Sequence, residues 1–159
     1  MDKESFSTTF AVNSPSEAVF DAINNVREWW SEDIEGCTDR LGSTFTYRNQ
    51  EVHRCTMEIV EHVPGRRIIW RVVDNFFNFT QNQTEWQGTH IVFEIAGAGN
   101  LTEVRFSHRG LVSDDECYDA CSSAWSAYIG GSLRALIETG RGRPNGVDRR
   151  TELGRAGTT

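Results

Sequence analysis

The chain has 159 residues and a mass of 18.0 kDa, with 38% hydrophobic and 25% charged residues, which fits one packed domain rather than a disordered chain. No apolar run reaches the roughly 18 residues of a membrane span, and Met1–Phe10 lacks the pattern of a signal peptide, so a cytoplasmic protein is expected. The net charge of -7 argues against a nucleic-acid binder, which needs a basic surface.

The charge is unevenly distributed along the chain. After Gly140, five arginines stand against two acidic residues, so this end carries +3, whereas the 11 basic and 21 acidic residues before it give -10. The end also has almost nothing apolar to bury. We therefore expect a single domain over residues 1–140 and a disordered basic tail over residues 141–159. The tail could contact RNA or an acidic partner, but a solvated terminus is the simpler interpretation.

The first part of the chain predicts one strand followed by two helices. Ser5–Val12 is typical of a strand, although its alternation is imperfect. Ser14 is a good helix N-cap, Pro15 suits the first helical position, and a glutamate three residues after the serine completes a capping box. Asn24-Asn25 interrupts this helix, and Val26–Trp30 predicts a second short helical turn before an acidic segment.

The middle of the chain is rich in strands whose apolar and polar residues alternate. The Pro64-Gly65 and Gly97–Asn100 segments supply turns between them. Because consecutive strands are joined by short links, we expect an antiparallel meander. The Phe-rich segment Asn75–Gln83 is harder to interpret: it could be a lid over a pocket, a dimer patch or an irregular strand. The predicted strands are Ser43–Arg48, His53–Val63, Arg67–Asp74, Thr89–Ala96 and Thr102–Arg109.

A long amphipathic helix is predicted at the end of the domain. Ser113 should cap it, the acidic residues that follow favour its N-terminal end, and Gly140 should stop it after Thr139. Gly130-Gly131 interrupts it, which indicates either a closely packed neighbour or a bend. Its expected buried stripe is Cys117, Cys121, Ala124, Trp125, Tyr128, Ser132 and Leu136.

The order of these elements resembles the START-like or SRPBCC superfamily, and within it the C-terminal domain of activators of heat-shock-protein-90 ATPase. The resemblance covers residues 5 to 144 and implies an α+β helix-grip fold, in which a curved antiparallel sheet wraps around a long C-terminal helix. The matching motifs are Ser14-Pro15-Ser16-Glu17-Ala18-Val19-Phe20, Trp29-Trp30, Pro64-Gly65-Arg66-Arg67-Ile68-Ile69-Trp70, Thr102 through Leu111, and Trp125 through Ser132-Leu133 to Gly140.

A sheet around a helix leaves a cavity wherever side chains fail to fill the space, so the inward residues are candidates for binding a small apolar or amphipathic molecule. The alternative is that these rings only fill the core. The inward candidates are Phe45, Tyr47, His53, Cys55, Met57, Trp70, Val72, Ile91, Phe93, Phe106 and His108 from the strands, with Trp125 and Tyr128 from the last helix.

Several polar residues on this inward set could orient a ligand or move a proton. His108 is the strongest, with a buried hydrogen-bonded structural histidine as the alternative. His53 and Asp74 lie at strand ends, and Tyr128 could bind a ligand carbonyl or anchor the helix. No Ser–His–Asp order, metal cluster or phosphate loop is present, so we predict neither a catalytic site nor a cofactor.

The four cysteines form no CxxC pair and are expected to be reduced thiols. Cys117 and Cys121 are four residues apart in the predicted helix, so they share a face and could suggest zinc. The four histidines, however, lack the spacing of zinc ligands. Buried apolar thiols are therefore the preferred interpretation.

Two other classes of function stay open. The resemblance implies a modulator of a heat-shock chaperone ATPase. An acidic stretch of Glu28, Glu32, Asp33, Glu35 and Asp39 could bind a basic partner, rim the cavity or simply remain solvated. Some relatives are cyclases or aromatases that shape a bound polyketide. The expected partners are thus a small molecule and a chaperone, and the protein is expected to be a monomer or a homodimer.

Overall fold

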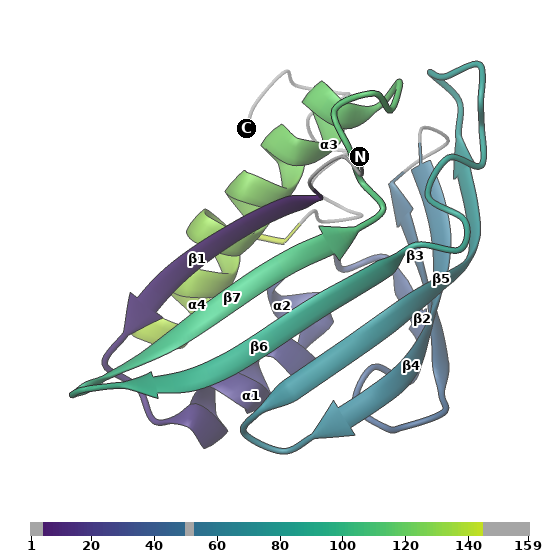
Figure 1. The fold of residues 1–159 in the computed structure, drawn as a ribbon. Coiled ribbons are helices and arrows are strands. Elements are labelled where there is room, and N and C mark those ends of the chain that lie inside the picture. The colour runs from purple at the N-terminus through teal and green to yellow at the C-terminus, as the bar shows by residue number, and fades with distance from the viewer. Residues whose placement is uncertain (1–4, 50–52, 145–159) are drawn as a thin grey trace, which may run out of the picture.

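A computed structural model describes residues 5–49 and 53–144, and these form one antiparallel sheet with the helices on one of its faces (Figure 1). The sheet order is β1-β7-β6-β5-β4-β3-β2, so the first strand returns beside the last one. The strands are β1 (Phe6–Val12), β2 (Ile34–Gly36), β3 (Thr44–Asn49), β4 (His53–Val63), β5 (Arg67–Phe77), β6 (His90–Ala98) and β7 (Leu101–Arg109).

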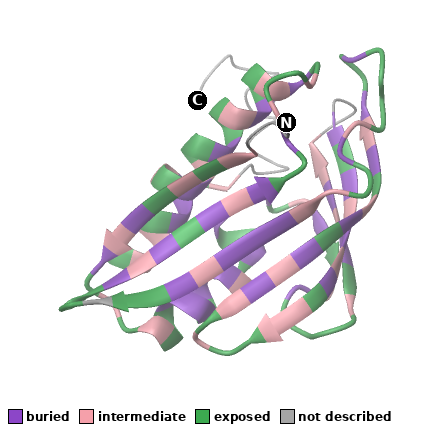
Figure 2. Cartoon of the chain, in the orientation of Figure 1, coloured by how far each residue is buried: buried purple, intermediate pink, exposed green. Residues whose placement is uncertain are grey.

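The predicted meander is confirmed, because β3 to β7 pair in sequence order. Buried and exposed residues alternate along each strand, as Figure 2 shows, because successive side chains point to opposite faces of a sheet. Two strands differ from the prediction. β5 continues to Phe77 instead of ending at Asp74, and the short strand β2 lies in the acidic segment, where Arg48 pairs with Glu35 across the β2–β3 edge.

The first helix begins later than its capping motif predicts. α1 (Ser16–Asn24) has Pro15 as its N-cap, with no side-chain capping bond. The prediction that Ser14 caps this helix is wrong: its hydroxyl donates instead to the Ile137 carbonyl of the last helix, 3.5 Å away. α2 (Val26–Trp29) follows at the predicted break.

The last helix is a continuous run of three parts: α3 (Tyr118–Trp125), the π-helical η1 (Ser126–Leu133) and α4 (Arg134–Thr139). It ends as predicted at Gly140, which adopts a left-handed φ of 83°. The predicted cap at Ser113 is wrong, because residues 112–117 form turns and Cys117 is the N-cap. The paired glycines lie in η1, so the helix widens there instead of simply bending.

The buried side of this helix also differs from the predicted stripe. Cys121, Trp125, Ile129 and Leu133 are buried, whereas Ala124 is exposed. The wider turn of η1 shifts which residues after Trp125 face the sheet, so Ile129 and Leu133 are buried whereas Tyr128 and Leu136 are only partly buried.

The start of the predicted basic tail packs on the helix. The Arg143 backbone N–H donates to Ser132 Oγ across 2.6 Å. Residues 145–159 lie outside the described residues, so the predicted disordered tail stays a prediction. Within residues 5–49 and 53–144, no helix is long and apolar enough to cross a membrane.

Candidate ligand-binding site

A cavity of about 180 Å³ lies between the sheet and the long helix. Its walls come from α2's C-terminal end, the paired ends of β3, β4 and β5, the loop after β5, and helix α3 with the start of η1. The lining residues are Trp30, Tyr47, Asn49, His53, Phe77, Phe79, Trp86, Ala120, Cys121, Ala124, Trp125 and Tyr128.

The aromatic walls are organised as stacked pairs. The Tyr47 ring lies parallel to the Trp30 ring, with 4.1 Å between centroids and 12° between planes. Trp86 stacks on Trp125 at 5.7 Å and 13°. These two pairs meet where Trp30 approaches Trp125, with centroids 5.1 Å apart. The cavity therefore has broad, rigid aromatic walls with few polar atoms.

His53 contributes an imidazole ring to the wall. Its Nε2 lies 3.0 Å from the Asn75 side-chain oxygen, to which the protonated nitrogen donates. Burial lowers the pKa of His53 to about 4, against which the Asn75 hydrogen bond raises it. At neutral pH this ring is uncharged, with its proton on Nε2 and an acceptor lone pair on Nδ1.

Behind the wall, His108 is fully buried and fixed through both ring nitrogens. Trp125 donates its indole N–H to Nδ1 across 3.1 Å, so the proton sits on Nε2, which lies 2.8 Å from the Thr89 hydroxyl. Burial, followed by the charges of His53 and His90, lowers the pKa of His108 to about 3. His108 is thus a neutral structural histidine that orients Trp125 rather than a lining residue.

The loop after β5 carries Phe79 and Trp86 into the wall, and carboxylates hold it against the start of α3. Glu85 accepts hydrogen bonds from the backbone N–H groups of Glu116 and Cys117, at 2.7 and 3.0 Å. Glu116 in turn accepts from the backbone N–H groups of Gln81 and Asn82. Glu85 thus satisfies backbone N–H groups just before α3, and Glu116 satisfies backbone N–H groups of the loop. These hydrogen bonds fix the loop beside the cavity.

Four of the thirteen residues predicted to line a cavity do so: Tyr47, His53, Trp125 and Tyr128. The other nine are buried in the core behind them: Phe45, Cys55, Met57, Trp70, Val72, Ile91, Phe93, Phe106 and His108. Asp74, predicted to end a strand, lies within β5 and pairs with Arg54 on the outer face. Binding by the thirteen residues stays a prediction.

Eight lining residues are not among those predicted from the sequence: Trp30, Asn49, Phe77, Phe79, Trp86, Ala120, Cys121 and Ala124. Phe77 and Phe79 belong to the Phe-rich segment for which a lid was one interpretation, and here they line the cavity from the end of β5 and the loop beyond it. Trp86 stands in a polar loop, where a large apolar side chain is a signal that it packs on something.

The cysteines near the cavity are buried thiols. Desolvation raises the pKa of Cys55, and the hydrogen bond with Cys121 together with burial raises that of Cys117. Both stay protonated, which suits packing better than metal ligation. Across the described ranges, no three His, Cys, Asp or Glu residues are grouped so that they could hold a metal ion.

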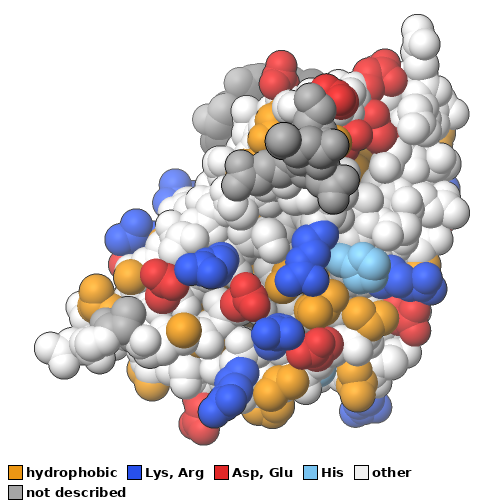
Figure 3. Space-filling model, viewed as in Figure 1, with side chains coloured by type: hydrophobic (Ala, Val, Ile, Leu, Met, Phe, Trp, Pro, Cys, Tyr) orange, Lys and Arg blue, Asp and Glu red, His pale blue; other side chains and the backbone are white. Residues whose placement is uncertain are grey.

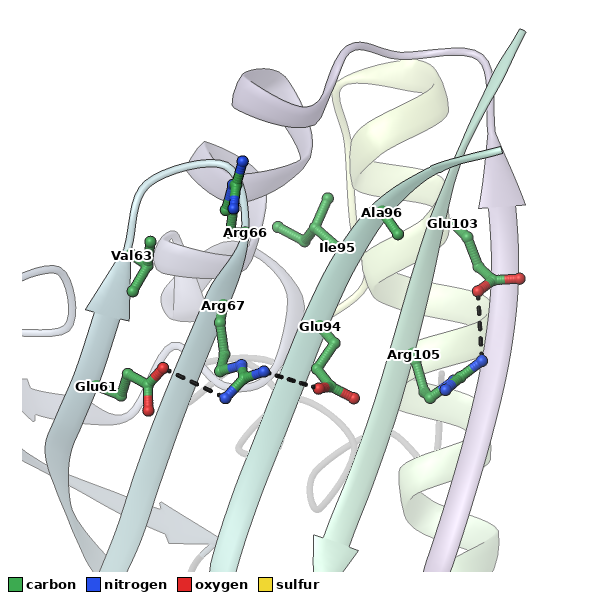
Figure 4. Close-up of a pocket in the computed structure, with 9 residues that line it drawn as sticks. All are labelled: Glu61, Val63, Arg66, Arg67, Glu94, Ile95, Ala96, Glu103 and Arg105. Atoms are coloured by element: carbon green, nitrogen blue, oxygen red, sulfur yellow. Dashed lines mark hydrogen bonds and ion pairs between the residues drawn. The ribbon is translucent and has the colours of Figure 1, made fainter. Parts of the chain in front are cut away.

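A larger groove of about 500 Å³ lies on the outer face of the sheet, but its charged groups neutralise one another. Figure 4 shows Arg67 between Glu61 and Glu94, at 3.5 and 3.3 Å, and Arg105 against Glu103 at 3.6 Å. The same face carries interspersed acidic and basic side chains in Figure 3. Such exposed ion pairs are typical of a solvated surface, so the aromatic cavity is the better candidate.

Part of the chain matches a known protein family. The family model described as "Activator of Hsp90 ATPase homolog 1-like protein" matches residues 13–138. No curated protein sequence matches the chain.

Several solved structures share the fold. The solution structure of the Aha1 dimer from Colwellia psychrerythraea is 22% identical, with a TM-score of 0.70 over 87% of this chain and 99% of that one. A protein from Staphylococcus saprophyticus is 17% identical, with a TM-score of 0.64 over 90% and 98% of the two chains. CalU16 from Micromonospora echinospora is 13% identical, with a TM-score of 0.59 over 82% and 73%.

Proposed function

The chain belongs to the activator of Hsp90 ATPase homolog 1-like family within the SRPBCC superfamily, and from that premise we propose that it binds a small hydrophobic or amphipathic molecule in its aromatic cavity. The observation that carries this proposal is a space of about 180 Å³ walled by stacked rings. An engineered apolar cavity of about 150 Å³ is large enough to bind benzene. The cavity thus suits one ring or a small fused pair.

Rigid walls support binding, because a preformed site loses little conformational freedom when a ligand enters. Trp30, Trp125 and His53 are all buried, and each is fixed by ring stacking or by a hydrogen bond. Tyr47, His53, Trp125 and Tyr128 are the predicted contact residues that also line the cavity. We propose that they form the ligand-contacting surface.

Ligand-observed fluorine NMR with 5-fluoroindole, a neutral fused-ring probe, tests this function. The wild-type protein should broaden the probe signal, and Ala124→Trp should abolish the effect, because Ala124 lines the cavity from the helix and a large ring there blocks it. Ser123→Trp is the matched control: this neighbour is exposed and does not line the cavity. No binding by the wild type, or equal binding by Ala124→Trp, would overturn the proposal.

The family match favours a second candidate, modulation of a heat-shock chaperone ATPase. Its test is the ATPase rate of a purified Hsp90 with and without this protein. Within the acidic stretch, Glu32 and Asp39 are exposed, so reversing both charges should remove any stimulation. An ATPase rate that this protein leaves unchanged would refute the second candidate and leave the first intact.

The oligomeric state belongs to the same proposal. The Colwellia psychrerythraea structure is of a dimer, and we propose that this chain is a monomer or a homodimer. Light scattering after size-exclusion chromatography distinguishes the two, and a higher mass would contradict both.

A further inference from the structure

The described residues that line the cavity carry no formal charge at neutral pH. None of the twelve described lining residues is Asp, Glu, Lys or Arg. His53, which could become a cation, is buried and donates through Nε2 to the Asn75 side chain. Its pKa of about 4 keeps it neutral at physiological pH. A ligand inside would therefore meet no opposite formal charge from these residues.

Two basic side chains that follow lining residues in the sequence point away from the cavity. Arg48 follows Tyr47 in β3, and Arg54 follows His53 in β4, so strand alternation places both arginines on the outer face. Each is already engaged: Arg48 pairs with Glu35, and Arg54 pairs with Asp74 at 3.6 Å. Neither is placed to neutralise an anion in the cavity.

Cations are disfavoured for a different reason. A cation–π site needs open ring faces. Here Tyr47 lies parallel over a face of Trp30, and Trp86 lies parallel over a face of Trp125. Trp30 is also nearly parallel to Trp70, with centroids 6.0 Å apart. The protein's own rings occupy surface that an aromatic cage would present to an ammonium group.

Resting on the proposed function, we infer that the cavity selects uncharged aromatic molecules and rejects both anionic and cationic molecules of the same shape. Charge selection follows because a buried ion without a partner loses its hydration and gains little in return.

Three probes of nearly equal shape separate charge from size: benzamide is neutral, benzoate is an anion and benzamidinium is a cation at pH 7. Titration of ¹⁵N-labelled protein should give benzamide-dependent shifts of the Trp30 and Trp125 signals. Benzoate and benzamidinium should bind at least tenfold more weakly. If all three bind with similar affinity, or if none binds while 5-fluoroindole does, the inference fails and the proposed function stands; if 5-fluoroindole does not bind either, the proposed function fails as well.

A gain-of-binding variant completes the test. Ala124 is an exposed helical residue at the cavity, so Ala124→Arg should bring a cation to its edge without disturbing the core. This variant should bind benzoate at least fivefold more tightly than the wild type and should not improve benzamidinium binding. Ser123→Arg adds the same charge outside the lining and should change neither affinity. Equal gains in Ala124→Arg and Ser123→Arg would point to long-range attraction and refute selection inside the cavity.

Discussion

The indole N–H of Trp125 donates to Nδ1 of His108 across 3.1 Å, inside a core where the histidine has no exposed surface. The bond joins the middle of the long helix to β7. It fixes the His108 tautomer and holds the Trp125 ring against Trp86, whose plane differs by only 13°. The geometry of the cavity wall therefore depends on a polar contact behind it.

Trp125→Phe should test that dependence. Phenylalanine keeps an aromatic ring but leaves the buried Nδ1 of His108 without its donor and creates a small void. We expect a loss of about 2–4 kcal/mol in the free energy of unfolding, measured by urea denaturation. Phe6→Leu, a change of a partly buried ring at the sheet edge, is the comparison and should cost less. An equal loss in both variants would contradict a special role for the hydrogen bond.

Two buried neutral histidines predict a definite pH dependence of stability. The pKa values of His53 and His108 in the folded protein are about 4 and about 3, against 6.5 in an unfolded chain. Above pH 6.5 both rings are neutral in either state and contribute no slope. As the pH falls below 6.5, the unfolded chain binds protons that the folded chain does not, so stability falls by about 1.4 kcal/mol per pH unit for each histidine.

Urea midpoints between pH 7.5 and 5 measure this slope in a range where carboxylates contribute less. His53→Gln should roughly halve it, because one of the two groups is removed while the amide can still reach Asn75. If the wild type and His53→Gln lose stability in parallel, the slope has another origin.

The sequence predicted the sheet well because alternation is a local property. Tyr47 and His53 were assigned to the inward face from parity alone, and both line the cavity. Trp86 could not be assigned in this way, since it lies in a loop without periodicity, which long-range hydrogen bonds of Glu85 hold beside the start of α3. The prediction that Ser14 caps α1 was wrong for a related reason. The Ser14 hydroxyl donates to the Ile137 carbonyl, 123 residues away, and capping rules consider only residues close in sequence.

Ser132 connects three parts of the chain at the π-helical segment. Its hydroxyl donates to the Trp29 carbonyl at 2.7 Å and accepts from the Arg143 N–H at 2.6 Å. Ser132→Ala leaves both backbone groups without this buried partner, so we expect a loss of about 1–3 kcal/mol. Ser126→Ala, an exposed change in the same segment, should be nearly neutral. Thermal denaturation of both variants measures the difference in stability. If Ser132→Ala is as stable as the wild type, the two hydrogen bonds of the hydroxyl do not contribute as expected.

Glu85 should contribute more than an ordinary surface carboxylate, because both of its oxygens accept backbone N–H groups at the start of the long helix. We expect Glu85→Ala to reduce the free energy of unfolding by about 1–2 kcal/mol. Glu94→Ala removes an exposed ion pair with Arg67 and should cost less than about 1 kcal/mol.

Hydrogen exchange separates a local effect of Glu85 from a global one. In Glu85→Ala the amides of Glu116 and Cys117 should exchange faster than in Glu94→Ala, because they lose their acceptor. The pKa of Asp115, which desolvation raises and the Glu85 charge raises further, should fall in Glu85→Ala. Unchanged protection of the two amides would mean that the loop holds its position beside the cavity by ring packing alone, with Trp86 as the anchor rather than the carboxylate beside it.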